Sequence, residues 1–344
     1  MADERRAQLR ALKLQTLVRD HFDAPDAAPR PYPTGAALVS DGDGWVLLED
    51  EPATGLGGAL AWAARQGVDR LHVLTESDAG LLARRAAAFA PPPYVWQIDG
   101  RTLDRADPEP RPTPPGLPAA AAALRPVIVA AGAEPVEEHG VLAGEVLGLE
   151  VCRAVVDDDP LASGESGARL DVGIGEHDRE AFRLVHGDGP VDAALAQVVT
   201  DVVAHRRPGA PPHALNRLAR ERALRHRLVD DPSLVGLSSL VPAPPPVPRT
   251  SLSDAVPCVA LGTDRSGAPI VVVCSAGIDL DLVPFAADAR DELAGPDARL
   301  VLAVPEGDDH PVTRELAARL AVPAEVVPVP APVPQPAPLS RPGT

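Results

Sequence analysis

Lysine is nearly absent from this sequence. Lys13 is the only lysine in 344 residues, and arginine supplies the other basic side chains. A site in the strand-forming parts of the chain that requires a lysine must therefore do without one. Aromatic residues are also scarce, at 3% of the chain. Because the hydrophobic residues are mostly Ala, Val and Leu, we expect thin, aliphatic cores.

The sequence has too few cysteines for a framework of disulfide bonds to stabilise the fold. The three cysteines are Cys152, Cys258 and Cys274, an odd number with no CxxC spacing. This pattern excludes a disulfide framework and a structural zinc site built on cysteine pairs. Each cysteine lies in an apolar, strand-like run, so we predict buried free thiols in a reducing cytoplasm.

Long hydrophobic runs are missing as well. No stretch approaches the roughly 18 apolar residues that a membrane-spanning helix needs. The first residues are charged and form a helical pattern, which is not typical of a signal peptide. The sequence therefore predicts a cytoplasmic protein with no membrane partner.

Positive charge is outweighed by negative charge. The formal net charge is −17, which favours solubility and repels phosphate backbones at long range. Nucleic-acid binders usually carry the opposite sign. Nucleic acid is therefore disfavoured as a general partner, and only a local basic patch would override this charge.

What the sequence does contain is a repeated order of elements. Asp41-Gly42-Asp43-Gly44 is a turn signal between two apolar runs, and residues 258–274 form a second hairpin pattern. Each hairpin is followed by a helix, a strand, a second helix and a second strand. We predict an α/β fold, with two similar small hairpin-α-β-α-β domains flanking a mixed α/β middle segment.

The predicted boundaries follow the proline-rich breaks, since about 150 residues per domain predicts two or three domains here. The segments are 1–30 N-terminal helix, 34–103 first α/β domain, 104–118 Pro-rich linker, 119–230 mixed α/β middle domain, 231–253 Pro-rich linker, 254–329 α/β domain similar to the first, and 330–344 disordered Pro-rich tail. Helices are expected over 4–22, 55–67, 78–89, 119–132, 190–205, 212–229, 284–294 and 311–320. Strands are expected over 71–74, 94–98, 144–156, 169–175, 299–304 and 324–329, with 144–156 forming either a strand pair or one long strand.

The element order of the two flanking domains resembles the core of restriction-endonuclease-like (PD-D/E-x-K) nucleases. That family holds a divalent metal with an Asp on one hairpin strand and an acidic residue two positions before a Lys on the next. The matching positions in the first domain are Asp41 or Asp43, then Glu49-Asp50-Glu51. The lysine position holds Glu51, which implies a degenerate active site.

The last domain departs further from the nuclease pattern. Asp264 matches the first Asp, but Cys274-Ser275-Ala276 occupies the positions of the acid and the lysine. As a whole, the chain also resembles proteins of GC-rich actinobacteria, with its Ala, Pro and Arg richness. Asp41 and Asp43 have a simpler interpretation as turn residues, and Glu49–Glu51 as an exposed strand end.

The middle segment carries the densest polar chemistry. Glu145, Glu150 and Asp171 lie in strand-like runs and are the candidate catalytic residues, while Glu150, Asp171 and Asp178 are the candidate metal ligands. Carboxylates that converge from strand ends can bind a metal or share a proton. The alternative is a set of ion-paired edge residues, with Asp178 as a helix cap, because no ligand spacing such as HExxH is present.

An arginine-rich stretch follows in the same segment. Arg217 and Arg220 are candidate binding residues for phosphates or an acidic partner, since leucines at helical spacing are expected to face inward and several of the arginines outward. The alternative is a solvated helix that pairs with acidic parts of the same protein.

Three hypotheses of function remain at this stage. The leading one is a non-catalytic interaction or scaffold protein built on nuclease-like domains, with a protein partner or self-association. The second is a metal-dependent hydrolase or divergent nuclease with its site in the middle domain, for which a divalent metal is the cofactor. The third is nucleic-acid association through Arg217 and Arg220. Convergence of Glu145, Glu150 and Asp171 within about 5 Å would favour the enzyme.

Overall fold

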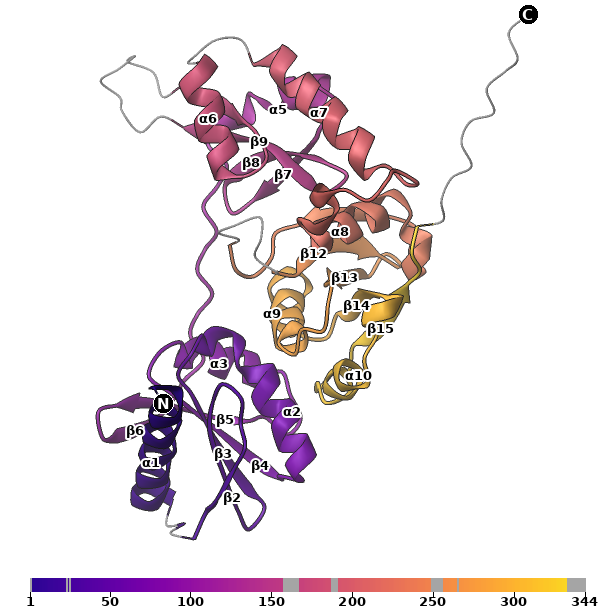
Figure 1. Ribbon diagram of the computed structural model, residues 1–344. Helices are drawn as coiled ribbons and strands as arrows, with labels where there is room; N and C mark the ends of the chain where they lie inside the picture. The colour runs from indigo at the N-terminus through magenta and orange to yellow at the C-terminus, as the bar shows by residue number, and fades with distance from the viewer. Residues whose placement is uncertain are drawn as a thin grey trace, which may run out of the picture. The chain divides into compact units, whose positions relative to one another are not determined.

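The computed structural model describes residues 2–22, 24, 26–156, 167–186, 191–248, 256–264 and 266–332 (Figure 1). These residues form a mixed α/β structure with three β-sheets, which confirms the predicted fold class. Residues 157–166 of the predicted middle domain and 333–344 of the predicted tail lie outside the described residues. No helix in the described ranges is long and apolar enough to cross a membrane.

The chain divides into two compact units, which we describe separately. The first contains residues 1–112, 278–302 and 309–326, and the second contains 113–277, 303–308 and 327–344. The six-stranded sheet of the first unit runs in chain order: β1 (Ala28–Arg30), β2 (Gly35–Ser40), β3 (Asp43–Leu48), β4 (Arg70–Thr75), β5 (Tyr94–Asp99) and β6 (Thr102–Arg105).

The predicted first hairpin is confirmed. Strands β2 and β3 pair antiparallel, with Asp41-Gly42 as a two-residue loop in which both residues have positive φ. An Asp-Gly loop of this kind matches the twist of the flanking strands. Strands β3, β4 and β5 are parallel neighbours, so their first residues, Asp43, Arg70 and Tyr94, lie at the same end of the sheet.

Helices cover both faces of this sheet. Trp45 and Leu47 share a core cluster with Leu14 and Leu17 of α1 (Ala2–Phe22). Because side chains alternate along a strand, Val46 and Leu48 face the other side, towards α2 (Leu56–Gln66) and α3 (Ala79–Ala86). Gly67 ends α2 in a left-handed conformation, as its position after the helical pattern predicts.

Two later helices belong to the first unit. Helices α9 (Leu282–Ala294) and α10 (Pro311–Ala318) pack on α2, and α9 also packs on α3. The segments after α3 and α10 exchange two backbone hydrogen bonds: Ala90 N donates to Arg319 O, and Ala321 N donates to Ala88 O, both at 2.9 Å. The two bonds flank an isolated antiparallel β-bridge between Phe89 and Leu320.

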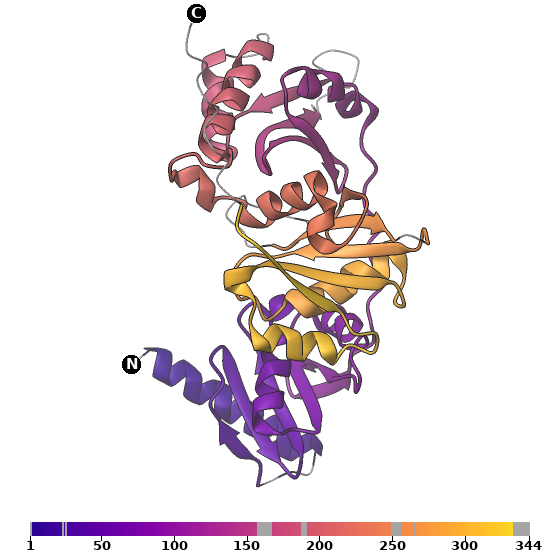
Figure 2. The same cartoon turned by 90° about the vertical axis from the view of Figure 1, so that its right-hand side faces the viewer.

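The second unit contains a four-stranded sheet in the order β10 (Ala168–Val172), β9 (Leu149–Val156), β8 (Val141–Val146), β7 (Glu134–Glu138). Helices α4 (Ala119–Ala122), α5 (Arg125–Ala130), α6 (Glu176–His186) and α7 (Asp192–Arg206) pack against it, as Figure 2 shows for α7. One helix was expected over 119–132. The chain forms two because Pro126 cannot donate the hydrogen bond that would continue the first.

A five-stranded sheet has the order β11 (Leu240–Ala243), β12 (Cys258–Thr263), β13 (Pro269–Cys274), β14 (Arg299–Pro305), β15 (Glu325–Val329). Part of the predicted Pro-rich linker thus forms β11. Pro242 is tolerated there because β11 is an edge strand. Helix α8 (Arg220–Asp230) packs on β11, β12 and β13. The helix expected over 212–229 is interrupted at Ala219, which has a φ of 47°.

Two adjacent glycines test the packing of α2 within the first unit. A Cβ on Gly57 would lie 1.8 Å from the backbone oxygen of Leu280, whereas a Cβ on Gly58 would meet only the Tyr32 hydroxyl at 3.3 Å. We predict that Gly57→Ala destabilises the protein by several kcal/mol, while Gly58→Ala is neutral or stabilises it by up to about 1 kcal/mol through helix propensity. Urea unfolding of both variants checks this, and equal midpoints would contradict it.

The Asp281 carboxyl predicts a pH dependence. Burial raises its pKa to about 7, against the opposing effect of Arg85, whose Nη1 lies 2.9 Å from it. The native state then holds a proton that the unfolded state releases between about pH 4 and 7. Stability conferred by Asp281 is therefore lost as the pH rises through this window. The stability of the wild type, measured relative to that of the Asp281→Asn variant at the same pH, should be lower at pH 8 than at pH 5. A difference in unfolding midpoint that does not vary with pH would refute this.

Candidate functional site

The structure brings two of the predicted catalytic carboxylates together. Glu145 and Glu150 are directly opposite one another on β8 and β9, and their exposed fractions are 2% and 1%. Two like charges in such a position repel each other, and burial adds a desolvation cost to each. The pair therefore requires positive partners close by.

Helix α8 supplies these partners from its inner face. Arg222 Nη1 donates to Glu145 at 2.7 Å, and Arg225 Nη2 lies 3.2 Å from both oxygens of the same carboxylate. Both arginines also bind Glu138, at 3.1 Å and 2.5 Å. Although burial alone would lower it, the pKa of Arg225 is raised, chiefly by the Glu145 charge.

Glu150 is engaged by three further contacts. Arg153 forms a bidentate pair with it at 2.9 and 3.0 Å, and Arg179 Nη1 donates to it at 3.0 Å. Arg222 Nη1 lies 3.5 Å from its second oxygen. Each buried carboxylate is thus bound by at least two guanidinium groups. We call this set the ion-pair cluster: Glu138, Glu145, Glu150, Arg153, Arg179, Arg222 and Arg225.

The other predicted ligands lie outside these contacts. Asp171, on β10, accepts a hydrogen bond from Arg169 Nε at 3.0 Å. Asp178 is exposed and is the third residue of α6, so it lies inside the first turn rather than at the cap position that the alternative predicted. In the part of the chain that the structure describes, no three His, Cys, Asp or Glu side chains are grouped to hold a metal ion. Glu145 and Glu150 therefore share arginine partners, and Asp171 has a different one.

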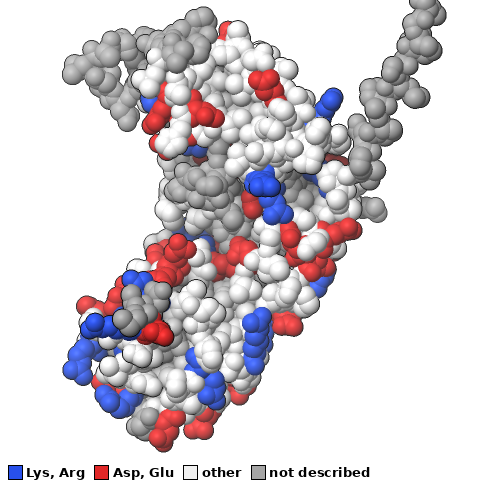
Figure 3. Space-filling model, in the orientation of Figure 1, with Lys and Arg blue, Asp and Glu red and all other residues white. Residues whose placement is uncertain are grey.

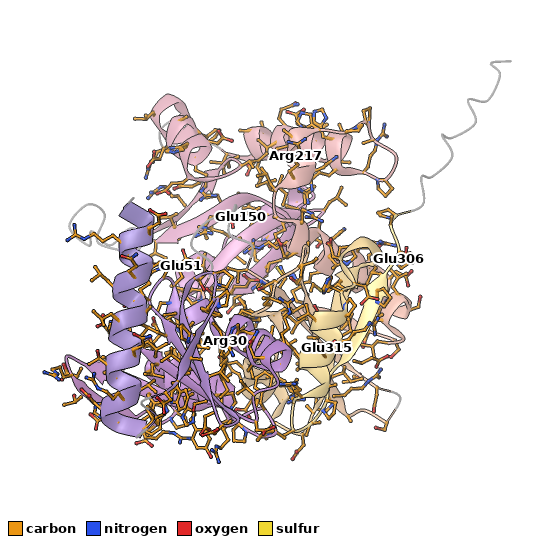
Figure 4. The ribbon with its side chains drawn as sticks, turned by 60° about the horizontal axis from the view of Figure 1, so that its bottom comes forward. Arg30, Glu51, Glu150, Arg217, Glu306 and Glu315 are labelled. Atoms are coloured by element: carbon orange, nitrogen blue, oxygen red, sulfur yellow. The ribbon has the colours of Figure 1, made fainter. Side chains whose placement is uncertain are left out.

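The arginine-rich stretch divides into an inner and an outer set. Arg217, at the end of the short helix η2 (Ala214–Arg217), is exposed (Figure 4). Arg220 is exposed as well and lies 3.4 Å from Asp308. Arg222 and Arg225 are not among the arginines that face outward, since they are 4% and 1% exposed. These two lie three residues apart, on the same stripe as the buried Leu228. The three-residue spacing of Arg222 and Arg225, together with glutamates in strand-like runs, is the sequence pattern that indicates buried ion pairs.

The nuclease-like positions of the first domain lie apart. Asp43 begins β3 and Glu49 follows its end, so about 20 Å of extended chain separates them. Glu49 accepts from Lys13 at 2.9 Å and from Arg10 at 2.8 Å, and Lys13 also binds Glu76 at 2.7 Å. Asp264 closes its own turn by accepting from Ser266 N and Ala268 N.

A cavity at the other end of the same sheet was not anticipated from the sequence. It has a volume of about 540 Å³ and is lined by the aromatic rings of Phe22, Trp45, His72 and Tyr94. His72 stacks on Trp45 with ring centroids 5.5 Å apart and on Tyr94 at 5.0 Å. Phe22 meets His72 edge-on at 5.0 Å. Ligand pockets typically have this size and this aromatic character.

The protonation of His72 follows from its hydrogen bonds. Trp96 Nε1 donates to His72 Nδ1 at 3.2 Å, so Nδ1 is the acceptor and the ring proton is on Nε2. His72 Nε2 lies 3.4 Å from Asp43 Oδ1. Burial lowers the pKa of His72 despite the opposing effect of Asp43, so the ring is neutral at pH 7.

The polar part of the lining is mostly acidic. Asp26, Ser40, Asp41, Asp43 and Arg70 complete the wall. Arg70 binds both oxygens of Asp43, at 2.5 and 2.6 Å, and this bond lowers the pKa of the carboxyl. The indole Nε1 of Trp45, a side chain that is 2% exposed, has no hydrogen-bond partner among the described residues.

Comparison of the chain with protein-family models, with curated proteins and with solved structures finds no match. The function must therefore be inferred from these two sites.

The ion-pair cluster predicts a large cost for removing a single partner. Arg225→Met leaves Glu145 and Glu138 short of a buried positive charge, which should destabilise the protein by about 3–5 kcal/mol. The double variant Glu145→Met with Arg225→Met should recover part of this loss. Arg220→Met, at an exposed pair, should cost at most about 1 kcal/mol. Chemical unfolding of the three variants measures these differences, and equal costs for Arg225→Met and Arg220→Met would contradict the assignment.

Proposed function

We propose that this chain is a non-catalytic binding protein, with a ligand cavity in its first unit and an interaction or scaffold role for the whole. The observation that carries the proposal is the state of the predicted catalytic acids. Glu145 and Glu150 are buried and bound by arginines. A hydrolytic metal site needs carboxylates that are open to a hard cation and a bound water.

Converting the cluster into a metal site would be costly. A cation that replaced Arg222 at Glu145 and Glu150 would leave a guanidinium with 4% residue exposure with Glu138 as its remaining partner in the cluster. Losing a buried partner of this kind costs about 3–5 kcal/mol. The cluster is therefore better suited to holding α8 against the sheet than to catalysis.

We also propose that the two flanking modules derive from a duplication. The series α1-β1-β2-β3-α2-β4-α3-β5 has the same order as α8-β11-β12-β13-α9-β14-α10-β15. The paired hairpin strands β2 and β12, and β3 and β13, each have six residues, and α3 and α10 each have eight. The reciprocal bonds Ala90–Arg319 and Ala321–Ala88 support this reading, since a duplicated pair meets through equivalent residues.

The charge distribution favours a protein partner or self-association over nucleic acid. On the face shown in Figure 3, basic side chains are scattered among acidic ones. Arg222 and Arg225 are committed to the ion-pair cluster, whereas the candidate binding residues Arg217 and Arg220 are exposed. A continuous basic surface is the usual footprint of nucleic-acid binding. On this proposal, the nuclease-like resemblance concerns the fold alone.

A metal titration tests the non-catalytic assignment. We expect Mg²⁺ or Mn²⁺, at matched ionic strength, to leave the thermal unfolding midpoint unchanged within about 1 °C, because the carboxylates are already neutralised by arginines. DNA and phosphodiester substrates should not be hydrolysed. Glu150→Gln and the exposed Glu137→Gln should behave alike in the titration. A midpoint rise in the wild type that disappears in Glu150→Gln but persists in Glu137→Gln would favour the hydrolase.

A further inference from the structure

We infer that Cys258 and Cys274 are a redox-sensitive pair, which closes into a reversible disulfide bond when a low-molecular-weight disulfide acts as the oxidant. The structure shows the reduced form, in which both residues are buried thiols of the second unit. Three features support the pair as a modification site: the register of its two strands, its position at their ends and the guanidinium beside it.

The strand register places the two cysteines side by side. Cys258 is directly opposite Cys274 in the antiparallel pair of β12 and β13, so both side chains are on the same face of the sheet. Directly opposite residues of antiparallel strands have Cα atoms about 4.5–5.5 Å apart. A disulfide bond spans about 4.4–6.8 Å between Cα atoms. The bond can therefore form without a change of register.

The third cysteine of the chain provides an internal comparison. Cys152 and Cys274 are both 0% exposed, and burial raises the pKa of both thiols. Cys152, however, is opposite Gly144 on β8 and Val172 on β10. Neither neighbouring strand presents a thiol to it. Strand register, rather than burial, thus distinguishes the Cys258–Cys274 pair from the remaining cysteine.

The pair lies where the hairpin can open. Cys258 is the first residue of β12 and Cys274 is the last residue of β13, so both lie at the end of the hairpin that is remote from its turn. Strand ends open locally at a lower free energy than the centre of a sheet. This opening gives a small oxidant access to thiols that are 2% and 0% exposed in the closed form.

A buried cation favours the first step of the oxidation. Helix α8 packs on β12 and β13. Although burial opposes it, the pKa of Arg225 on this helix is raised by the charges of Glu145 and Cys258. For Cys274, burial outweighs the opposite effect of Arg225 and raises the pKa. A cationic neighbour stabilises the thiolate, which is the nucleophile. We therefore assign Cys258 as the attacking residue and Cys274 as the resolving one.

The reaction exchanges one disulfide for another. The Cys258 thiolate attacks one sulfur of the oxidant, which forms a mixed disulfide and releases a first thiolate that takes up a proton. The Cys274 sulfur then attacks the Cys258 sulfur, and its proton passes to the second leaving thiolate. The two cysteines lose two electrons in total, and the oxidant disulfide is reduced to two thiols.

Oxidation of the native full chain by glutathione disulfide tests the inference. The protein is quenched in acid, unfolded with an alkylating reagent, and analysed by intact mass and by peptide mapping. We expect the loss of two hydrogen atoms, alkylation of Cys152 alone, and a cross-linked peptide pair that contains Cys258 and Cys274. Treatment with dithiothreitol should restore alkylation of all three cysteines, because the exchange is reversible.

Single variants separate the pair from the remaining cysteine. Cys152→Ala should form the same cross-link at a rate within about twofold of the wild type, whereas Cys258→Ala should leave Cys274 at least about tenfold slower to react, because the attacking thiol is missing. The peptide map of the wild type identifies the bond by itself. The test therefore does not depend on the stability of either variant.

Three results would overturn the inference. The first is a native chain that stays fully reduced, while the urea-unfolded chain forms the cross-link under the same conditions. The second is a mixed disulfide on Cys152 that forms as fast as the cross-link, which would show that global unfolding exposes all the thiols. The third is a set of mixed disulfides on Cys258 and Cys274 in place of the bond between them. The metal titration decides the proposed function independently of these results.

Discussion

The pairing of buried charge is the constraint on which the second unit depends. Glu145 and Glu150 face one another inside a sheet, where two carboxylates are stable only if cations neutralise them. Arg222 and Arg225 meet this requirement from one face of α8. The same helix buries Leu224 and Leu228 and packs on β11, β12 and β13. One ionic requirement thus positions the helix that joins two layers of strands.

Arginine solves the same problem in the first unit. Arg84 binds both oxygens of Asp288, a carboxylate with a fully buried side chain, and Arg85 binds Asp281. A planar guanidinium can satisfy two acceptors at once, which a lysine ammonium does less well at a buried site. A chain with a single lysine is therefore not at a disadvantage in its interior. Its ion pairs are built from the residue whose geometry suits burial.

The sequence predicted the local elements well and the long-range pairings poorly. The hairpin at Asp41-Gly42 and the end of α2 at Gly67 follow from backbone preferences of a few adjacent residues. The pairing of Glu150 with Arg222 could not be predicted, because the two residues are 72 positions apart along the chain. The cavity could not be predicted from the sequence for the same reason. Its rings come from α1, β3, β4 and β5, and no short motif joins them.

The cavity lies at the end of the sheet opposite to the one where acidic residues are held in ion pairs. Ligands of parallel α/β sheets usually bind beyond the carboxyl ends of the strands. In the first unit, that end carries Glu49 and Glu76, and Lys13 bridges both of them. Arg10 adds a second positive charge at Glu49. The only lysine therefore binds the acidic residues at the carboxyl-terminal edge of the sheet. The opposite edge begins with Asp43, Arg70 and Tyr94, and it is there that the rings and carboxylates surround open space.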